Sequence, residues 1–589
     1  MRTRILLLAG ASFALAIPAL AQQGAQQPPQ PAPAPQPVAN TASPVSNQPA
    51  PAGALSTGPG ESDVVTQSLT ADQLPAPPPP IEYPAHARRD PWSVGRLDPA
   101  DIGLGRVPWG GANGTFLSSL MRRMQTPLAS RWAHIALRDA LLSKARAPRN
   151  VNPVDWVAER AWLLLRLGEA DAARMLVAGV DTNRFTPKMV QVAVQSALAT
   201  ADPPGLCPVE NQIRSVEPNI RELVTAMCSS LSGEPETAAA QIDDARRFGR
   251  IGGIDLALAE KVVGAGANTG RAVTIEWEPV EQLTAWRFGL ATATGMAVPD
   301  KLLRAGSPQL RAFQARAPLL SADQRLDSAR VAAGLGVFSA QSLVDLYSTI
   351  YESTDPSDLP GTDAWRLREA FVGKDRDARL AAIRQLLGND KDPNTREASR
   401  ALVARAATLI DPDPKLEADA PELISAMLSA GYDAAAARWI PAVRGMKNEP
   451  ADRVWAMLAL SSANPRGLDL SYSRITAFIG RDKSPGKVRS ALLVAGLGGL
   501  GRINAGSVDS LNRRYGLALG HRTTWTRLID RAAALGQPGT VLALSGTGLQ
   551  TPLWSNVPGS HLYHVLAALK RTGQDFTARM IAAEALSRT

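Results

Sequence analysis

The chain has 589 residues and a formal charge of +9, from 63 Lys and Arg against 54 Asp and Glu. Hydrophobic residues make up 45% of it, which is enough to bury an extensive core. The excess charge is small for this length and no long run of Lys and Arg occurs. The composition therefore argues against nucleic-acid binding and allows weak attraction to anionic polymers of a cell envelope.

The first 21 residues have the three parts of a secretory signal peptide. Arg2 and Arg4 precede an apolar stretch from Ile5 to Ile17, and Ala19-Leu20-Ala21 follows as a cleavage site. The apolar stretch is shorter than the roughly 20 residues that a membrane span needs. We expect residues 1–21 to be removed. The loss of two arginines leaves a mature chain of charge +7, which we expect to be periplasmic and without an integral membrane segment.

Two segments without helical periodicity follow the signal peptide. Residues 22–80 form a linker rich in Pro, Ala and Gln, and its part up to residue 60 carries no charge. Such a segment cannot bury enough apolar surface to offset the entropy of ordering, so it is predicted to be disordered, either as a spacer or as a tolerated tail. Residues 81–114 combine Pro and Gly with Trp92 and Trp109, which predicts an extended arm that packs on the folded part.

Residues 115–589 are predicted to form one α-helical repeat domain, because pairs of helical patterns recur along them. Each pair consists of an apolar helix, a glycine, a short turn and a helix of small residues. Glycine suits the left-handed position that ends a helix, and a small residue lets the second helix approach the first. The five glycines are Gly168, Gly233, Gly431, Gly536 and Gly573, and the small residues five positions later are Ala173, Ala238, Ala436, Val541 and Ala578.

These units resemble tetratricopeptide repeats, although the glycines do not recur at the repeat length of about 34 residues. The pattern predicts an all-α fold, an α-solenoid of tetratricopeptide-like helical hairpins, with a compact irregular helical domain as the alternative. The best strand pattern, AVTIEW at residues 272–277, is short. Six tryptophans in helical patterns are expected to anchor the core, and some of them could line a groove: Trp132, Trp156, Trp162, Trp439, Trp455 and Trp525.

The two cysteines, Cys207 and Cys228, are predicted to form a disulfide, because an exported protein meets an oxidising compartment. The alternative is two separate buried thiols. The spacing is not C-x-x-C, which argues against a redox pair. On the chain-entropy estimate, a bridge across this loop stabilises the fold by roughly 3 kcal/mol.

Residues 496–501, GLGGLG, match the G-x-G-x-x-G pattern of dinucleotide-binding sites. Such a site needs a strand before the glycines and an acidic residue about 20 positions after them. Residues 484–495 have helical periodicity instead, and Asp509 comes too early. We therefore expect a helix–helix turn with close backbone packing, and no cofactor.

His561 and His564 are three positions apart on a predicted helix and could share a metal ion. No further His, Cys or carboxylate within a helical turn completes a ligand set, so a capping or solvated pair is expected. The sequence thus predicts no catalytic, cofactor-binding or metal-binding residue. A carboxylate pair of a glycan-cleaving site could still form, because such pairs are close in space and not in sequence.

Three stretches also resemble a group of exported helical-repeat proteins of Gram-negative bacteria, some of which have Pro-rich N-termini. They are residues 89–111, residues 226–239 with Cys228, and residues 566–586. The resemblance implies a helical fold and an envelope location. It implies no activity and therefore assigns no functional residue.

The sequence as a whole predicts an exported, non-enzymatic scaffold or adaptor. It would bind an envelope protein or peptide through a helical-repeat surface, without a cofactor. The alternatives are a cell-wall glycan-acting enzyme or accessory, and a module that binds an envelope polymer.

Overall fold

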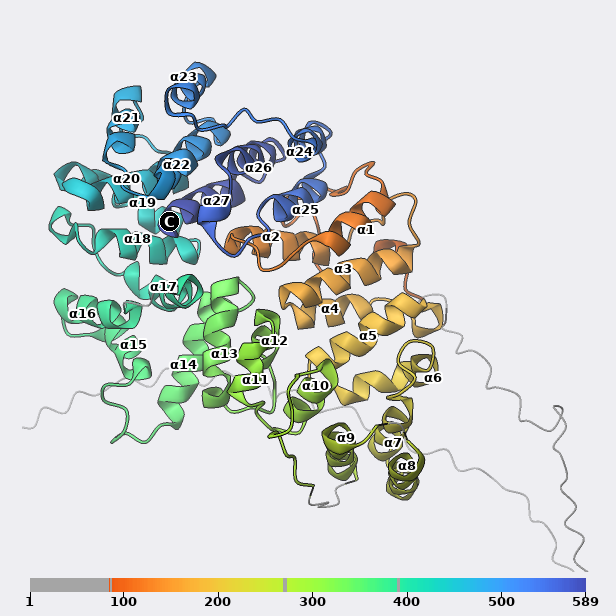
Figure 1. The fold of residues 1–589 in the computed structure, drawn as a ribbon. Helices are drawn as coiled ribbons and strands as arrows, with labels where there is room; N and C mark the ends of the chain where they lie inside the picture. The colour runs from red at the N-terminus through yellow and green to blue at the C-terminus, as the bar shows by residue number, and fades with distance from the viewer. Residues whose placement is uncertain (1–83, 85–86, 250, 268–272, 389–391) are drawn as a thin grey trace, which may run out of the picture. The chain divides into compact units, whose positions relative to one another are not determined.

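A computed structural model of the chain describes Pro84 and residues 87–249, 251–267, 273–388 and 392–589. The predicted signal peptide and the predicted disordered linker lie outside these residues. The described residues belong to a unit that spans residues 79–589, and their regular structure consists of helices without a strand (Figure 1). This confirms the all-α prediction. Residues 273–277, the described part of the best strand pattern, lie in a loop.

The first nine α-helices lead away from the N-terminal arm. They are α1 (Gly114–Arg123), α2 (Arg131–Leu142), α3 (Pro153–Leu167), α4 (Ala170–Val177), α5 (Pro187–Ala199), α6 (Glu210–Ile213), α7 (Arg221–Leu231), α8 (Pro235–Phe248) and α9 (Gly253–Gly266). The middle nine are α10 (Ala285–Ala293), α11 (Asp300–Ala305), α12 (Pro308–Gln314), α13 (Ala322–Leu335), α14 (Ala340–Ser353), α15 (Asp363–Val372), α16 (Arg376–Leu387), α17 (Pro393–Ala407) and α18 (Ala420–Ser429).

The last nine α-helices return toward the first ones (Figure 1). They are α19 (Asp433–Ala437), α20 (Asn448–Ser461), α21 (Tyr472–Arg481), α22 (Val488–Gly499), α23 (Ala505–Tyr515), α24 (Thr524–Ala534), α25 (Pro538–Gly548), α26 (Gly559–Arg571) and α27 (Asp575–Ser587). Short 3-10 helices join them: η2 (Pro91–Ser93), η3 (Thr182–Arg184), η4 (Pro203–Val209), η5 (Pro414–Leu416), η6 (Ile440–Gly445), η7 (Pro485–Lys487) and η8 (Trp554–Asn556).

All five predicted helix pairs form hairpins: α3–α4, α7–α8, α18–α19, α24–α25 and α26–α27. The glycine after the first helix of each pair has a positive φ, between 64° and 91°. The small residue five positions later is 0% exposed in each pair. Both parts of the prediction are therefore confirmed, because a left-handed residue ends each first helix and a small side chain packs where the two helices meet.

The first helices of the unit pack against the last ones (Figure 1). α2 contacts both α25 and α27, and it also contacts α13 from the middle of the chain. Trp132 of α2 meets Phe576 of α27 edge to face, with ring centroids 5.5 Å apart. A stack in which each hairpin touches only its neighbours lacks such contacts. The hairpin pattern concerns neighbouring helices alone, so it does not predict these contacts between the first and the last helices.

The segment before α1 lies against the helices. Trp109 is 1% exposed and meets Trp156 of α3 edge to face at 5.2 Å. The backbone N–H of Arg96 donates to the carbonyl of Leu142, and that of Gly539 donates to the carbonyl of Pro108. Backbone hydrogen bonds and one buried indole thus attach this segment to α2, α3 and α25.

Two arginines, one buried and one partly buried, cap helix C-termini, whose last carbonyls have no partner within the helix. Arg160 of α3 donates to the carbonyls of Leu141 and Ser143 at the end of α2, at 2.9 and 3.0 Å, and to that of Val94 at 2.7 Å. Burial lowers the pKa of Arg160 to about 9. Arg502 serves the end of α20 in the same way. Arg160 thus joins α3 to α2 and to the segment before α1, and Arg502 joins the end of α22 to α20.

Candidate binding groove

The glycine cluster of residues 496–501 serves helix packing. Gly496, Gly498 and Gly499 lie inside α22, and only Gly501, with φ of 63°, forms the turn that was predicted for the cluster. A Cβ atom on Gly499 would lie 2.8 Å from the carbonyl oxygen of Tyr563 in α26. The glycines therefore allow α22 and α26 to approach closely, and a helix stands where a dinucleotide site needs a strand.

The predicted cysteine pair is close in space. Cys207 of η4 and Cys228 of α7 lie at disulfide distance, with their Cα atoms 5.6 Å apart. Cys228 is buried within the helical core. The bridge thus ties the η4 segment to α7, and it is compatible with export to an oxidising compartment.

The two histidines of α26 have separate partners. His561 Nδ1 lies 3.1 Å from the carbonyl oxygen of Gly548, at the end of α25, and the ring packs against Trp525 at a tilt, with centroids 4.4 Å apart. His564 Nδ1 lies 2.8 Å from Asp530 Oδ1 in α24. Within the described ranges, no group of three or more His, Cys, Asp and Glu could hold a metal ion. The histidines thus join α26 to α24 and α25.

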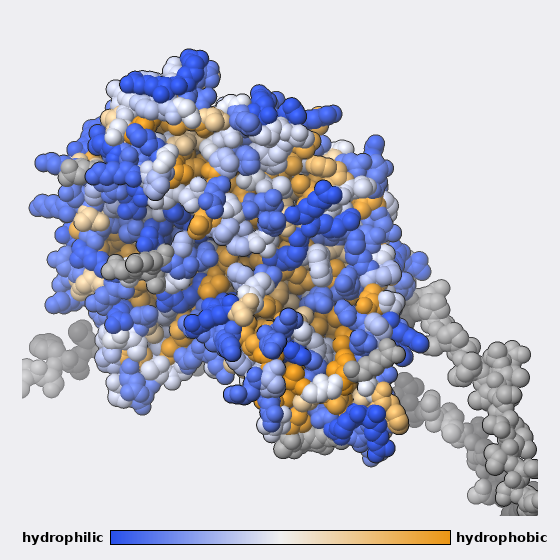
Figure 2. Space-filling model, viewed as in Figure 1, coloured by the Kyte–Doolittle hydropathy of each residue, from blue (hydrophilic) through white to orange (hydrophobic). Residues whose placement is uncertain are grey.

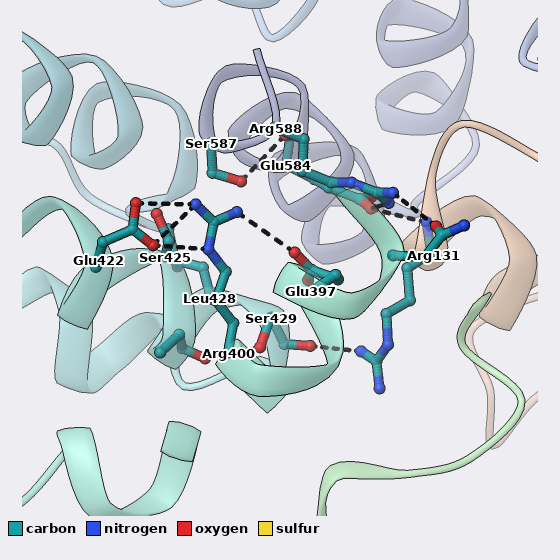
Figure 3. Close-up of polar contacts among 12 residues, drawn as sticks. Arg131, Glu397, Arg400, Glu422, Ser425, Leu428, Ser429, Glu584, Ser587 and Arg588 are labelled. Atoms are coloured by element: carbon teal, nitrogen blue, oxygen red, sulfur yellow. Dashed lines mark hydrogen bonds and ion pairs between the residues drawn. The ribbon is translucent and has the colours of Figure 1, made fainter. Parts of the chain in front are cut away.

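A buried network of charges lies where the N- and C-terminal helices meet (Figure 3). Glu584 of α27 accepts hydrogen bonds from the hydroxyl of Ser130 at 2.5 Å and from the backbone N–H of Arg131 at 2.8 Å. Arg588 donates to the same carboxylate at 2.8 Å. A carboxylate is stabilised at the positive N-terminal end of a helix. Glu584 of the last helix therefore caps the N-terminus of α2.

The second part of this network joins α17 to α18. Arg400 is 1% exposed, and its guanidinium donates to Glu422 at 2.9 and 3.1 Å and lies 3.5 Å from Glu397 (Figure 3). Burial alone would lower the pKa of Arg400, but the charges of Glu422 and Glu397 outweigh it, so the pKa is raised. These three charges are paired with one another. Their arrangement fits a structural role.

A solvent-facing site lies instead at α20 and α21, and its centre is Asp452. This carboxylate accepts one hydrogen bond from Arg474 at 2.8 Å and two from Arg481 at 2.7 and 2.8 Å. Burial would raise the pKa of Asp452, but the hydrogen bonds and charges of the two arginines lower it. Asp452 is therefore ionised at neutral pH, and its charge is compensated by two fixed cations.

Trp455, one turn after Asp452 on α20, forms the apolar part of this centre. Its Nε1 donates to the carbonyl of Asp469 at 2.9 Å, which attaches the loop of residues 462–471 to α20. The guanidinium of Arg474 lies over the indole, 4.0 Å from the ring centroid, and Phe478 of α21 packs beside it at 5.8 Å. A cation over an aromatic face is attracted by the ring. The arginine is thus held from two sides.

Two adjoining cavities open around this centre, and both include Asp452 and Arg481 in their walls. The first cavity has a volume of about 760 Å³, and the residues that complete its wall are Ile440, Val443, Arg444, Met446, Lys447, Ala451, Trp455, Gly467, Leu468, Asp469 and Arg474. The second has about 850 Å³, and its further wall residues are Glu449, Arg453, Ala456, Phe478, Gly480, Asp482, Lys483, Ser484, Pro485, Arg489, Leu586 and Thr589. We call the two cavities together the α20–α21 groove.

The groove presents unpaired cations next to apolar side chains. Within the part of the chain that the structure describes, the side chains of Arg444, Lys447 and Lys483 form no ion pair. All three are exposed to solvent. Figure 2 shows hydrophilic residues over most of the visible face, with apolar residues between them at upper left over α21 and α22. The site can therefore attract an anion and also contact an apolar group.

This site was not predicted from the sequence. Trp455 was expected in the core or in a groove. It is 1% exposed and so belongs to the core, and it also lies in the wall of the first cavity, where Arg474 covers its ring. Arg474, Phe478 and Arg481 occupy positions i, i+4 and i+7 of one helix, which places them on one face of α21. This spacing is the one signal that could have identified the site. The spacing indicates a site only together with Asp452, and the helical pattern does not distinguish Asp452 from other acidic residues.

None of the helices in the described part of the chain combines the length and the apolar character that crossing a bilayer requires. Comparison of the chain with protein-family models, with curated proteins and with solved structures found no match.

Proposed function

We propose that the protein is an exported, non-enzymatic scaffold of the periplasm that binds a segment of another envelope protein in the α20–α21 groove. The observation that carries the proposal is the groove itself. Its centre is pre-organised, because Asp452, Arg474 and Trp455 hold one another in place. Its walls leave three cations without a partner. A preformed site loses little conformational entropy when a ligand binds.

The location rests on the predicted signal peptide of residues 1–21 and is supported by the cysteine pair at disulfide distance. The predicted linker of residues 22–80 would act as an extended spacer on the N-terminal side of the helical part. A helical-repeat surface is suited to this task, since repeats present extended faces for other proteins.

A glycan-cleaving enzyme is the less favoured alternative. Such an enzyme needs one carboxyl group that stays protonated near neutral pH and donates its proton. In the groove, the pKa values of Asp452 and Asp482 are both lowered, because arginines hold the first and serine hydroxyl and backbone N–H groups hold the second, against the opposing effect of burial. Trp455, at 1% exposed, is also covered and cannot stack on a sugar.

Site-specific photo-crosslinking in intact cells that export the full chain tests the proposal. A photoreactive phenylalanine derivative replaces Leu468 in the groove wall, and the matched control replaces Leu319, which is 62% exposed between α12 and α13. We expect a discrete crosslinked protein from position 468 and none from position 319. Crosslinks from both positions or from neither contradict the proposal. So does release of soluble fragments from peptidoglycan by the purified chain.

A further inference from the structure

We infer that the groove takes an acidic, amphipathic polypeptide segment, whose carboxylates meet Arg444, Lys447 and Lys483 while its apolar side chains lie on the wall formed by η6 and the 462–471 loop. The inference rests on the proposed function and adds the chemistry of the partner. It is carried by three properties of the groove: its excess of basic side chains, its apolar wall and its division into two neighbouring cavities.

Basic side chains outnumber acidic side chains in both cavities. The wall of the first has four Lys and Arg against two Asp, and that of the second has four against three acidic residues. The carboxylate at the centre, Asp452, is already neutralised by Arg474 and Arg481 and therefore repels an incoming anion only weakly. Of the cations that remain available, Arg444 and Lys447 line the first cavity and Lys483 lines the second. The resulting field favours a ligand that carries negative charge.

The apolar wall favours a polypeptide over a simple polyanion as the ligand. Ile440 and Val443 of η6, Met446 just after it and Leu468 of the facing loop line the first cavity between its cations. Each of them is at least partly buried, yet each contributes to the cavity surface. A ligand gains from this wall only if it carries apolar groups next to its charges. Acidic peptide segments with alternating apolar residues have that composition, and an envelope polyanion without apolar groups does not.

The form of the groove favours an extended ligand. Each cavity alone has the volume of a small-molecule pocket, which ranges from about 300 to 1,000 Å³. The two cavities share Asp452 and Arg481 in their walls, so they lie next to each other on the surface. Lys483 belongs to the second cavity, whereas Arg444 and Lys447 belong to the first. A segment whose acidic residues are spread along its length can reach all three cations.

Peptide binding to the full chain tests the inference by fluorescence anisotropy. The probe is a fluorescein-labelled octapeptide of alternating Glu and Leu. One comparison peptide has Gln for every Glu, a second has Ser for every Leu, and the third probe is polyglutamate of equal length. We expect the Glu–Leu peptide to bind at least tenfold more tightly than the other three, and its binding to weaken as ionic strength rises. Equal binding of the Gln–Leu peptide, or of polyglutamate, overturns the inference.

The groove cations give a matched pair of variants. Arg444→Gln combined with Lys447→Gln removes two exposed, unpaired cations of the groove. Lys301→Gln combined with Lys374→Gln removes two exposed cations outside it. An exposed ion pair changes affinity by roughly two- to fivefold, so we expect about a tenfold loss for the groove variant and no change for the control. Equal affinities of the two variants overturn the inference, and matching circular dichroism and thermal midpoints verify their folding.

The two proposals fail in different ways. If position 468 crosslinks a protein in cells but the Glu–Leu and Gln–Leu peptides bind equally, the scaffold proposal stands and the acidic-partner inference is wrong. If neither position crosslinks and no peptide binds, both are wrong. Polyglutamate binding that disappears in the Arg444→Gln, Lys447→Gln variant would assign the groove to an anionic polymer instead.

Discussion

Replacing Gly499 by alanine should destabilise the protein, although alanine is the better helix former. Gly499 lies in α22, and a Cβ atom there would approach the backbone oxygen of Tyr563 to 2.8 Å and Leu566 Cβ to 3.0 Å. Ordinary contacts of a Cβ atom begin at 3.4 Å, so about 0.6 Å of space is missing at the carbonyl. A backbone carbonyl of α26 cannot rotate away as a side chain can, so the two helices would have to separate.

The size of the effect follows from two opposing contributions. Overpacking of this kind costs roughly 1–3 kcal/mol, and a backbone obstacle places it near the upper end. The gain from replacing a helical glycine by alanine is about 1 kcal/mol. The net loss is therefore about 2 kcal/mol. Gly480, exposed in the last turn of α21 with nothing within 4 Å of its Cβ position, provides the control, and Gly480→Ala should be neutral or stabilise by up to about 1 kcal/mol.

Differential scanning calorimetry of the full chain measures the two variants against the wild type, and hydrogen exchange locates the effect. We expect a lower midpoint for Gly499→Ala, with faster exchange in α22 and α26, and an unchanged or higher midpoint for Gly480→Ala. If Gly499→Ala is as stable as Gly480→Ala, close packing is not the reason for glycine at position 499. The account of the GLGGLG cluster would then be wrong.

Three further predictions concern the bridge, the buried network and the export signal. The double variant Cys207→Ser, Cys228→Ser should lose about 3 kcal/mol of stability, and a reductant should lower the calorimetric midpoint of the wild type and leave that of the variant unchanged. The charges of Arg400 and Arg453 outweigh burial and lower the pKa of Glu422, so its stabilisation is present above the ordinary carboxyl pKa of about 4.3 and lost as pH falls through the lowered value. The difference in midpoint between wild type and Glu422→Gln should therefore shrink below about pH 4, and a constant difference would contradict the pairing. N-terminal sequencing of exported protein should begin at Gln22, and a start at Met1 would exclude cleavage of residues 1–21.

The hairpins could be predicted from the sequence because the forces that form them are local. A glycine at the left-handed position and a small residue five positions later act within about 20 residues, and Gly168 with Ala173 shows both parts in place. The position of the glycine cluster was predicted less accurately. A run of glycines indicates close backbone approach, but only the packing of α22 on α26 shows that three of the four glycines lie inside the helix.

The closure of the helical array could not be predicted, because it depends on residues at opposite ends of the chain. Glu584 accepts hydrogen bonds from Ser130 and from the backbone of Arg131, more than 450 positions away. Nothing in the neighbourhood of either segment indicates the other. The groove was missed for a related reason. Asp452 and Arg481 are 29 positions apart on different helices, and each taken alone has the character of an ordinary surface charge.

Because several arginines are buried, the net charge of the chain overstates the positive charge that is available at the surface. Arg131, Arg160, Arg400 and Arg579 are each at most 6% exposed, and they donate to helix-end carbonyls or to buried carboxylates. Part of the positive charge that suggested general attraction to anionic polymers is therefore used inside the fold. The attraction available to a partner therefore comes from the cations that remain at the surface, among them the unpaired cations of the α20–α21 groove. Salt-sensitive binding of an acidic ligand should thus be weakened about tenfold by the loss of two groove cations and unaffected by equal changes of charge elsewhere.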